Sequence, residues 1–512
     1  MKIERTQNAK INIIFGTIYK VYQIVIPFIM RTLMIYEMGM EYAGLNNLFT
    51  SIFQILNLAE LGIGAALTYS MYKPIAEDNT EEICALLKLY KKCFFVIGCV
   101  VASLGILCVP FLGILVSGNI PGNLNMLILY LMYLINTVLS YWLFSYKKSL
   151  LYAHQRNDVI SKVMLFTSTI QFVLQAYVLV FMKNYYLYLA CSIFAQILQN
   201  IICAILTQII YPKYKPEGSL DIKTIADIKK KVQGLITNKI GGTVLRSADS
   251  VVISSFLGLS ILAVYQNYYF ILTAIISIFS IVFESCVAGV GNSLIVETSK
   301  KNYEDLKTVT YIVGALICVS CACFVALYQP FMIIWVGKEY LMEFSLVVCL
   351  IIYFFLYEID QLVGLYKDAA GIWYSDRYRT VISAIANLVL NIVLVQYIGL
   401  YGVLLSTILA LLIIDLPWLL RNVFKTIFLG QSLIGYIAEL LKIALYAFIS
   451  SIITYVICKN IIYGGILGLI IKLIIAVIIS VGVFCIAEFR SAQFNKCKRI
   501  LLSMFRKGKN NA

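Results

Sequence analysis

The sequence is poor in the residues from which catalytic and metal sites are usually built. Only 13% of its 512 residues are charged, and it contains a single histidine, His154. One histidine excludes a multi-histidine metal site, and the fourteen cysteines are scattered without metal-ligand spacing, as small buried hydrophobic residues are. No glycine-rich phosphate loop ends in Lys-Ser or Lys-Thr, so ATP hydrolysis is not expected. We therefore expect neither a metal nor an organic cofactor.

Hydrophobic residues make up 61% of the chain, and the mean hydropathy is +0.89. They form continuous runs, each near or above the ~20 residues that a helix needs to cross a bilayer. This pattern predicts an all-α integral membrane protein with about fourteen transmembrane helices. The expected spans are 9–34, 44–72, 92–117, 122–146, 160–182, 185–211, 232–257, 261–287, 308–335, 343–366, 378–398, 401–424, 437–458 and 461–487.

Lysine and arginine fall almost entirely on one side of the membrane when these spans are threaded across it. With the N-terminus in the cytoplasm, cytoplasmic segments hold 33 of the 41 Lys and Arg residues and the opposite side holds four. Cytoplasmic loops are enriched in these residues, so both termini are expected in the cytoplasm. The net charge of +15 is interpreted as orienting the helices and attracting lipid headgroups, and no nucleic-acid partner is expected.

The sequence contains a duplicated unit of roughly 220 residues. Lys20 precedes Gly39 by nineteen residues, and Lys239 precedes Gly258 by the same interval. Further matches follow in order: Ala43–Asn47 with Ala263–Asn267, and GIGAAL at Gly62 with GVGNSL at Gly289. The predicted domains are a six-helix N-lobe (1–211), a cytoplasmic linker (212–231), a six-helix C-lobe (232–424), and a C-terminal helix pair with a basic tail (425–512). Six helices per lobe make the repeat parallel, and such lobes usually bind substrate between them near the midplane.

Ionisable residues lie inside the first and seventh spans, where each costs at least ~2.5–3.5 kcal/mol and normally faces a cavity or a partner. At 100° per residue they fall on one side of each helix. These sides consist of Lys20, Gln23, Pro27 and Arg31 on the first span, and of Lys239, Arg246 and Asp249 on the seventh. A cavity lined by these cations suits an anionic substrate, and Asn47 and Asn267 could hydrogen-bond sugars.

Structural roles are the alternative for several of the embedded charges. Arg31 could snorkel to the external interface, and Arg246 and Asp249 could neutralise each other at i and i+3. Glu358 and Asp360 could lie near a helix end and be solvated. Lys20 and Lys239 differ from these because both are mid-span and hold equivalent positions in the repeat, which favours a cavity-lining role.

Three segments carry a resemblance to a known family. They are SADSVVISSFLG (Ser247–Gly258), AVYQNYYFI (Ala263–Ile271) and LNLAELGIGAAL (Leu56–Leu67). With the six-plus-six-plus-two organisation of the spans, they make the chain resemble the polysaccharide transporters of the MATE-like MOP exporter superfamily, especially Wzx-type flippases. The resemblance covers essentially the whole chain.

The resemblance implies a flippase that moves a lipid-linked oligosaccharide, of the undecaprenyl-pyrophosphate type, across the bacterial plasma membrane by alternating access. Pyrophosphate would bind near Lys20, Lys239 and Arg246, with Arg31 helping on the external side. A proton or sodium ion would be coupled, with candidates Glu60, Asp249 and Glu284. The last two helices would form a groove for the lipid tail or serve only in packing. We expect a monomer that works among membrane lipids and with other polysaccharide biosynthesis proteins.

Two other classes of function are considered. A drug or cation exporter of the same fold would favour an acidic, aromatic cavity, and the cations on the first and seventh spans argue against it. A membrane glycosyltransferase or polymerase would need charged residues in a sizeable external loop, and the predicted external loops are short. We therefore predict a transporter and not an enzyme.

Overall fold

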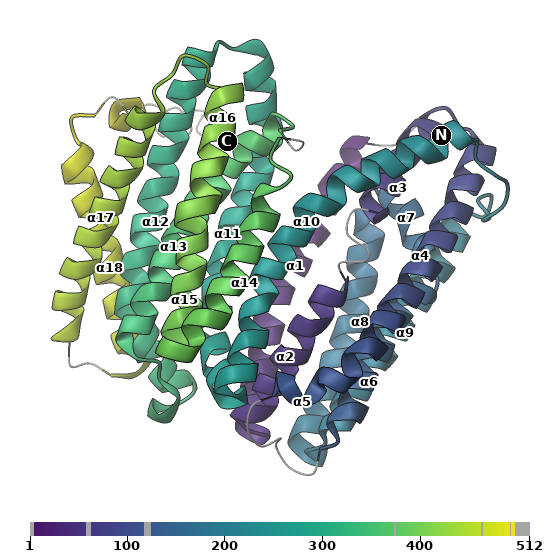
Figure 1. The fold of residues 1–512 in the computed structure, drawn as a ribbon, viewed down its shortest axis with the longest axis horizontal. Coiled ribbons are helices and arrows are strands. Elements are labelled where there is room, and N and C mark those ends of the chain that lie inside the picture. Colours follow the sequence, from purple (N-terminus) through teal and green to yellow (C-terminus); the bar gives the residue numbers. More distant parts are fainter. Residues whose placement is uncertain are drawn as a thin grey trace. The chain divides into compact units, whose positions relative to one another are not determined.

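The structure is a computed structural model that describes residues 5–57, 63–116, 124–372, 375–461, 464–491 and 493–496. Within these ranges it consists of helices and short connections, and contains no strand. Contacts divide the chain into two compact units, unit 1 (Met1–Ala263) and unit 2 (Val264–Ala512). The boundary falls in the first turns of α11, so each unit is described by itself (Figure 1).

Unit 1 contains the first ten α-helices. They are α1 (Arg5–Glu37), α2 (Met40–Leu56), α3 (Ile63–Ala76), α4 (Thr80–Cys108), η2 (Val109–Phe111), α5 (Leu112–Leu115), α6 (Met126–Trp142), α7 (Ser145–Ala153), α8 (Asn157–Tyr177), η3 (Val178–Met182), α9 (Tyr185–Ile210) and α10 (Ile222–Leu257). The α10 helix begins inside the stretch predicted as linker, because Asp221 caps its first turn through the backbone N–H of Thr224.

Unit 2 contains the remaining helices, which run side by side as a bundle in Figure 1. They are α11 (Leu259–Val296), α12 (Ser299–Trp335), η4 (Lys338–Tyr340), α13 (Phe344–Ala369), α14 (Arg379–Ile398), α15 (Leu400–Leu409), η5 (Ala410–Asp415), α16 (Leu416–Thr426), α17 (Leu433–Lys459) and α18 (Gly465–Glu488). The long α12 is the centre of this packing, because it contacts α13, α17 and α18.

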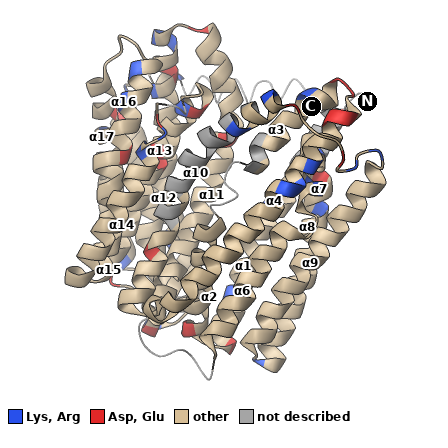
Figure 2. Cartoon of the chain, turned by 45° about the vertical axis from the view of Figure 1, so that its right-hand side comes forward, with Lys and Arg blue, Asp and Glu red and all other residues tan. Residues whose placement is uncertain are grey.

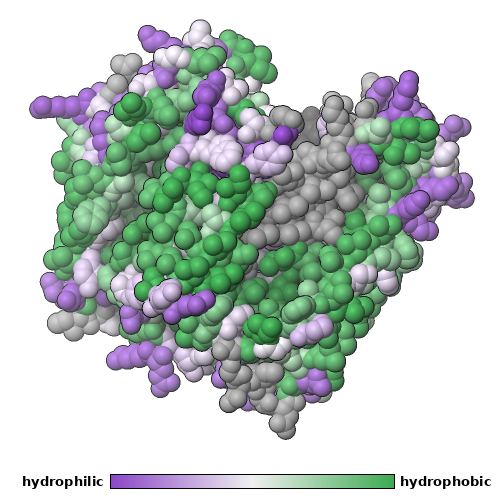
Figure 3. Space-filling model, viewed as in Figure 1, coloured by the Kyte–Doolittle hydropathy of each residue, from purple (hydrophilic) through white to green (hydrophobic). Residues whose placement is uncertain are grey.

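The helices confirm the prediction of an all-α, multi-pass membrane protein. In the part of the chain described, eleven helices are long and apolar enough to cross a membrane, or twelve if the bent pair α6–α7 is one span. The predicted count of fourteen is not confirmed. The expected span 44–72 includes residues 58–62, which lie outside the described set, and many side chains of the span 232–257 are not described. Charged residues gather towards the helix ends in Figure 2, and apolar residues cover much of the surface between them in Figure 3.

The two glycines that mark the sequence repeat have the same backbone conformation. Gly39, between α1 and α2, has φ 108° and ψ 168°, and Gly258, between α10 and α11, has φ 92° and ψ 170°. Residues with a Cβ rarely adopt such positive φ angles, so glycine is needed at both corners. Each corner joins a long helix to the next helix along the chain. The repeat therefore places equivalent turns after α1 and α10.

The corner between α10 and α11 packs closely on α2 within unit 1. A Cβ atom on Gly44 would lie 2.2 Å from the backbone oxygen of Leu259, so only a residue without a side chain fits there. Contacts of α10 with α3 and α5 continue this packing along the helix. The α10 helix therefore packs on three other helices of unit 1, namely α2, α3 and α5.

Candidate functional site

Two predicted site residues form a polar strip on the apolar part of α1, which begins at Ile18. Lys20 and Gln23 are exposed, one turn apart, and Gln23 donates to the hydroxyl of Tyr19 across 2.8 Å. Tyr22 and Thr169 of α8 share a hydrogen bond of 2.9 Å, which fixes the strip to its neighbour. The exposure of Lys20 and Gln23 leaves both side chains accessible to a ligand.

Arg31, farther along α1, is half-buried and donates hydrogen bonds to two oxygens. Its Nη1 donates to Oδ1 of Asn47 across 3.1 Å, and its Nη2 donates to the backbone oxygen of Ala263 across 3.3 Å. The structure therefore brings together two predicted site residues, Arg31 and Asn47, and ties both to the first turn of α11. In the adjacent position, Asn46 accepts from Tyr133, whose hydroxyl is also 3.1 Å from that of Tyr185.

The other predicted site residues divide into three groups. The side chains of Lys239 and Arg246 and the whole of Glu60 lie outside the described residues. Asp249 and Asn267 are buried, with exposed fractions of 7% and 0%. Glu284 is exposed on α11.

An arginine cluster in unit 2 was not predicted. Arg379, at the start of α14, donates to carboxylates from three segments of the chain and is only 4% exposed. Its partners are Asp376 at 2.9 Å from Nε, and Asp360 of α13 and Asp415 of η5 at 3.1 and 2.7 Å from Nη1. Asp360 is therefore paired, whereas the sequence had allowed it to be solvated. The sequence contained one indication of this cluster, namely that Asp360 and Asp415 lie inside predicted spans. Carboxylates buried in a membrane normally pair with a cation.

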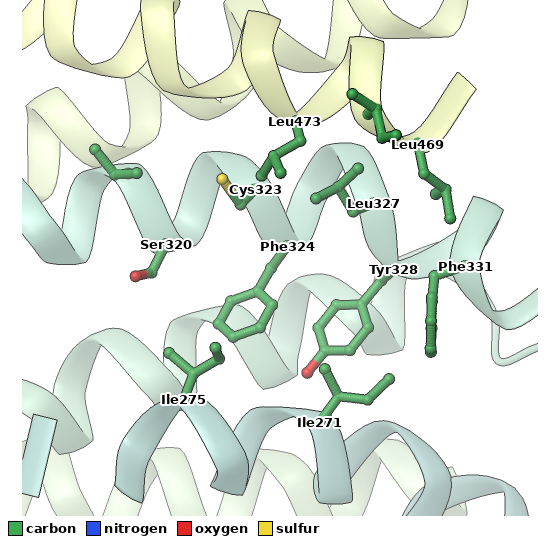
Figure 4. A pocket seen from close by; sticks show the side chains of 12 residues that line it. Ile271, Ile275, Ser320, Cys323, Phe324, Leu327, Tyr328, Phe331, Leu469 and Leu473 are labelled. Atoms are coloured by element: carbon green, nitrogen blue, oxygen red, sulfur yellow. The ribbon is translucent and has the colours of Figure 1, made fainter. Parts of the chain in front are cut away.

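Two apolar grooves flank the C-terminal helix pair in unit 2. The α18 groove, about 430 Å³, lies between α11, α12 and α18, and in Figure 4 the rings of Phe324 and Tyr328 stand between Ile271 and Ile275 of α11 and the leucines of α18. The α17 groove, about 750 Å³, lies between α17 and the helices α12, α13, α15 and α16.

The linings of both grooves are almost wholly hydrocarbon. Ser320 and Tyr328, the latter through its ring hydroxyl, are polar side chains labelled in the α18 groove in Figure 4. Ser451 and Tyr455 of α17 are the corresponding polar residues of the α17 groove. The C-terminal helices therefore border apolar grooves as well as packing on α12.

Comparisons with solved structures show the fold class. A lipid II flippase, MurJ, in an inward closed conformation aligns with a TM-score of 0.68 and 15% identity, over 93% of this chain and 99% of the other. An inward-facing multidrug resistance MATE transporter of the MOP superfamily aligns with a TM-score of 0.58 and 12% identity, over 80% and 96%. A MATE protein in a bent conformation gives a TM-score of 0.53 and 12% identity, over 82% and 95%. The fold of this chain is therefore the one seen in the MurJ and MATE structures.

Sequence comparison gives the family within that class. The family described as "Polysaccharide biosynthesis protein" matches residues 10–288, more than half of the chain. The chain therefore belongs to the polysaccharide biosynthesis protein family, which confirms the resemblance found in its motifs. A search of curated protein sequences finds no match.

Proposed function

We propose that this protein is a flippase that moves a lipid-linked oligosaccharide, carried on undecaprenyl pyrophosphate, across the bacterial plasma membrane by alternating access. Membership of the polysaccharide biosynthesis family supports the glycan part of this substrate. The α17 groove is the observation that supports a lipid-linked substrate. A prenyl chain needs a long hydrocarbon-lined surface, and the groove offers one. A hydrophilic drug would gain no binding free energy from such a surface.

The cationic residues predicted from the repeat are proposed to bind the pyrophosphate. Lys20 is exposed on α1, as this role requires, and Lys239 and Arg246 occupy the equivalent helix of the repeat. Gln23, Asn47 and Asn267 remain the proposed sugar-binding residues. The hydrogen bonds of Arg31 make it a positioning residue for Asn47 in this proposal.

The remaining parts of the proposal follow the sequence. Coupling to a proton or sodium ion at Glu60, Asp249 or Glu284 is proposed, as are cytoplasmic termini and a monomer surrounded by membrane lipids. Partners would be other polysaccharide biosynthesis proteins. An exporter of organic cations with the same fold is the alternative, supported by the likeness to MATE transporters in fold alone.

A flipping assay in proteoliposomes tests the proposal. Purified protein is reconstituted with a fluorescent polyprenyl-pyrophosphate oligosaccharide, and its arrival in the far leaflet is followed. We expect transport by the wild type, loss in the Lys20→Gln/Lys239→Gln variant, and normal transport in Lys425→Gln, which changes an exposed lysine of α16. Normal transport by the double variant would overturn the cationic site. Efflux of an organic cation without flipping would favour the alternative.

A further inference from the structure

One face of α13 is apolar along its whole length apart from a single carboxyl. Ile351, Phe354, Leu362 and Leu365 are all buried, and at 100° per residue they fall in one sector of the helix. Glu358 lies in the middle of this sector and is 0% exposed. It is fifteenth in a helix of 26 residues, and therefore far from both ends. The interpretation of Glu358 as a solvated helix-end residue was wrong.

The Glu358 carboxyl has no polar partner in the part of the chain described. Neither Oε1 nor Oε2 accepts or donates a hydrogen bond, and both atoms are buried. One turn away, the ring of Phe354 packs edge-on against Phe324 of α12, at 5.1 Å between centroids, and against Phe279 of α11, at 5.9 Å. The helix turn next to the carboxyl is therefore packed among aromatic rings.

The neighbouring helices place no cation against this carboxyl. The helices packed against α13 are α12, α15, η5 and α16, and α11 also contacts it through Phe279. The charged residue of α11 is Glu284, which is exposed. Beyond Lys307, α12 contains no charged residue, and its titratable group near Glu358 is the thiol of Cys321. Among the charged residues of the other neighbours and of α13 itself, Asp360 and Asp415 bind Arg379 of α14, and Lys367 binds Asp368 and Asp376. Arg421 and Lys425 are exposed.

An ionised carboxylate in such a place would be buried without compensation, and such groups take up a proton instead. We propose that Glu358 holds a proton in this conformation and releases it to water when transport exposes α13, so that it is the carboxyl through which a proton gradient drives the flippase. The bond that breaks is the carboxyl O–H, and the proton passes to water. This inference rests on the proposed function, and it selects the proton as the coupling ion at a residue outside the three earlier candidates.

The α17 groove supplies the space in which this exchange could occur. Cys321 lines that groove and is also the thiol beside Glu358. Phe355 and Ile359, on either side of the carboxyl along α13, line the same groove. A movement of α13 that displaced Phe355 and Ile359 would give water in the groove a route to the carboxyl, and a prenyl chain in the groove would keep that water out. Proton release would thereby be linked to departure of the lipid tail.

Infrared spectroscopy tests the proton site without any transport assay. A protonated carboxylic acid has a carbonyl stretch that a carboxylate lacks. We expect the wild type at neutral pH to show this band, Glu358→Gln to lose it, and Glu439→Gln, which changes a carboxylate paired with Lys442, to keep it. Glu358→Leu, in which the two unpartnered oxygens are gone, should lose the band and fold at least as stably. A spectrum of Glu358→Gln identical to that of the wild type would overturn the proton site.

Transport in proteoliposomes tests the coupling. Flipping of the fluorescent polyprenyl-pyrophosphate oligosaccharide is measured with and without an imposed pH gradient. The wild type and Glu439→Gln should be accelerated by the gradient, and Glu358→Gln should respond to it no longer. Equal acceleration of Glu358→Gln would overturn the coupling role while leaving the flippase intact. A wild type that shows the infrared band and moves no oligosaccharide lipid would instead reject the proposed function and retain the proton site.

Discussion

Arg31 donates to Oδ1 of Asn47 across 3.1 Å, and this hydrogen bond ties α1 to α2 beside the α10–α11 corner. Removing the guanidinium leaves the oxygens of Asn47 and Ala263 without this donor. Hydrogen bonds to charged groups contribute about 1.5–3 kcal/mol each, so Arg31→Ala should lower the thermal stability of the purified protein clearly. Lys92→Ala, at an exposed lysine of α4 in the same unit, should leave stability nearly unchanged.

A double-mutant cycle separates the bond from other effects of the substitution. If Arg31 and Asn47 act together, Arg31→Ala/Asn47→Ala will destabilise the protein by less than the two single changes combined. Additive losses would show that the two residues stabilise the protein independently, and the positioning role of Arg31 would then be rejected.

Gly44 offers a second test of the same corner. Alanine there would place a Cβ atom 2.2 Å from the backbone oxygen of Leu259, and backbone cannot move aside as a flexible side chain can. We expect Gly44→Ala to reduce the yield of folded protein and its melting temperature. Gly113→Ala is the matched control, because no described residue places an atom within 4 Å of its Cβ position. At such an open site alanine usually stabilises by about 0.4–1 kcal/mol.

The Arg379 cluster should be the most sensitive charged site of unit 2. Removing one partner of a buried ion pair typically costs about 3–5 kcal/mol. Arg379→Ala would remove the shared cation of three carboxylates at once, of which Asp376 keeps Lys367. Asp415→Asn should cost less, because Arg379 keeps Asp360 and Asp376. The melting temperatures should therefore rank Arg379→Ala below Asp415→Asn, with Arg421→Ala, an exposed arginine, near the wild type. The reverse order would contradict the assignment of Arg379 as the centre of the cluster.

The sequence was sufficient for the features that depend on local pattern. Runs of apolar residues predicted the helices, and the equal spacing of Lys20–Gly39 and Lys239–Gly258 anticipated two corners that share one backbone conformation. The sequence pattern alone did not reveal which charged side chains form ion pairs. Arg379 was counted with the cytoplasmic loops, yet it lies buried between carboxylates from α13 and η5. Such pairings depend on how helices pack, and helical periodicity specifies only the side on which a residue lies.

His154 provides a test of pH dependence outside the membrane spans. Its ring lies 4.2 Å from that of Tyr211, between centroids, and Nδ1 donates to the backbone oxygen of Leu150 across 2.9 Å. Burial lowers the pKa of His154 below its ordinary value of 6.5. The unfolded chain therefore binds a proton more readily than the folded protein, so this contribution to stability is present above pH 6.5 and is lost as the pH falls.

The expected result is a steeper fall of melting temperature in the wild type than in His154→Phe between about pH 7.5 and pH 5.5, the range over which histidine titrates. Phenylalanine retains a ring against Tyr211 and cannot be protonated. It also lacks the bond to Leu150, so its absolute stability should be lower at neutral pH by about 0.5–1.5 kcal/mol. Parallel pH profiles of the two proteins would show that folding does not lower the pKa of His154.

Filling the α17 groove tests whether it receives the lipid tail. Ala444 lines this groove, and Ala444→Trp would occupy part of its 750 Å³ without removing any charge from the proposed pyrophosphate site. Transport of a long-chain polyprenyl-pyrophosphate oligosaccharide should fall several-fold, while a short-chain analogue should be transported nearly as well as by the wild type. Ser320→Trp, in the α18 groove, is the control for bulk added elsewhere in unit 2. If Ser320→Trp alone impairs the long-chain substrate, the tail binds in the α18 groove and the assignment to the α17 groove is wrong.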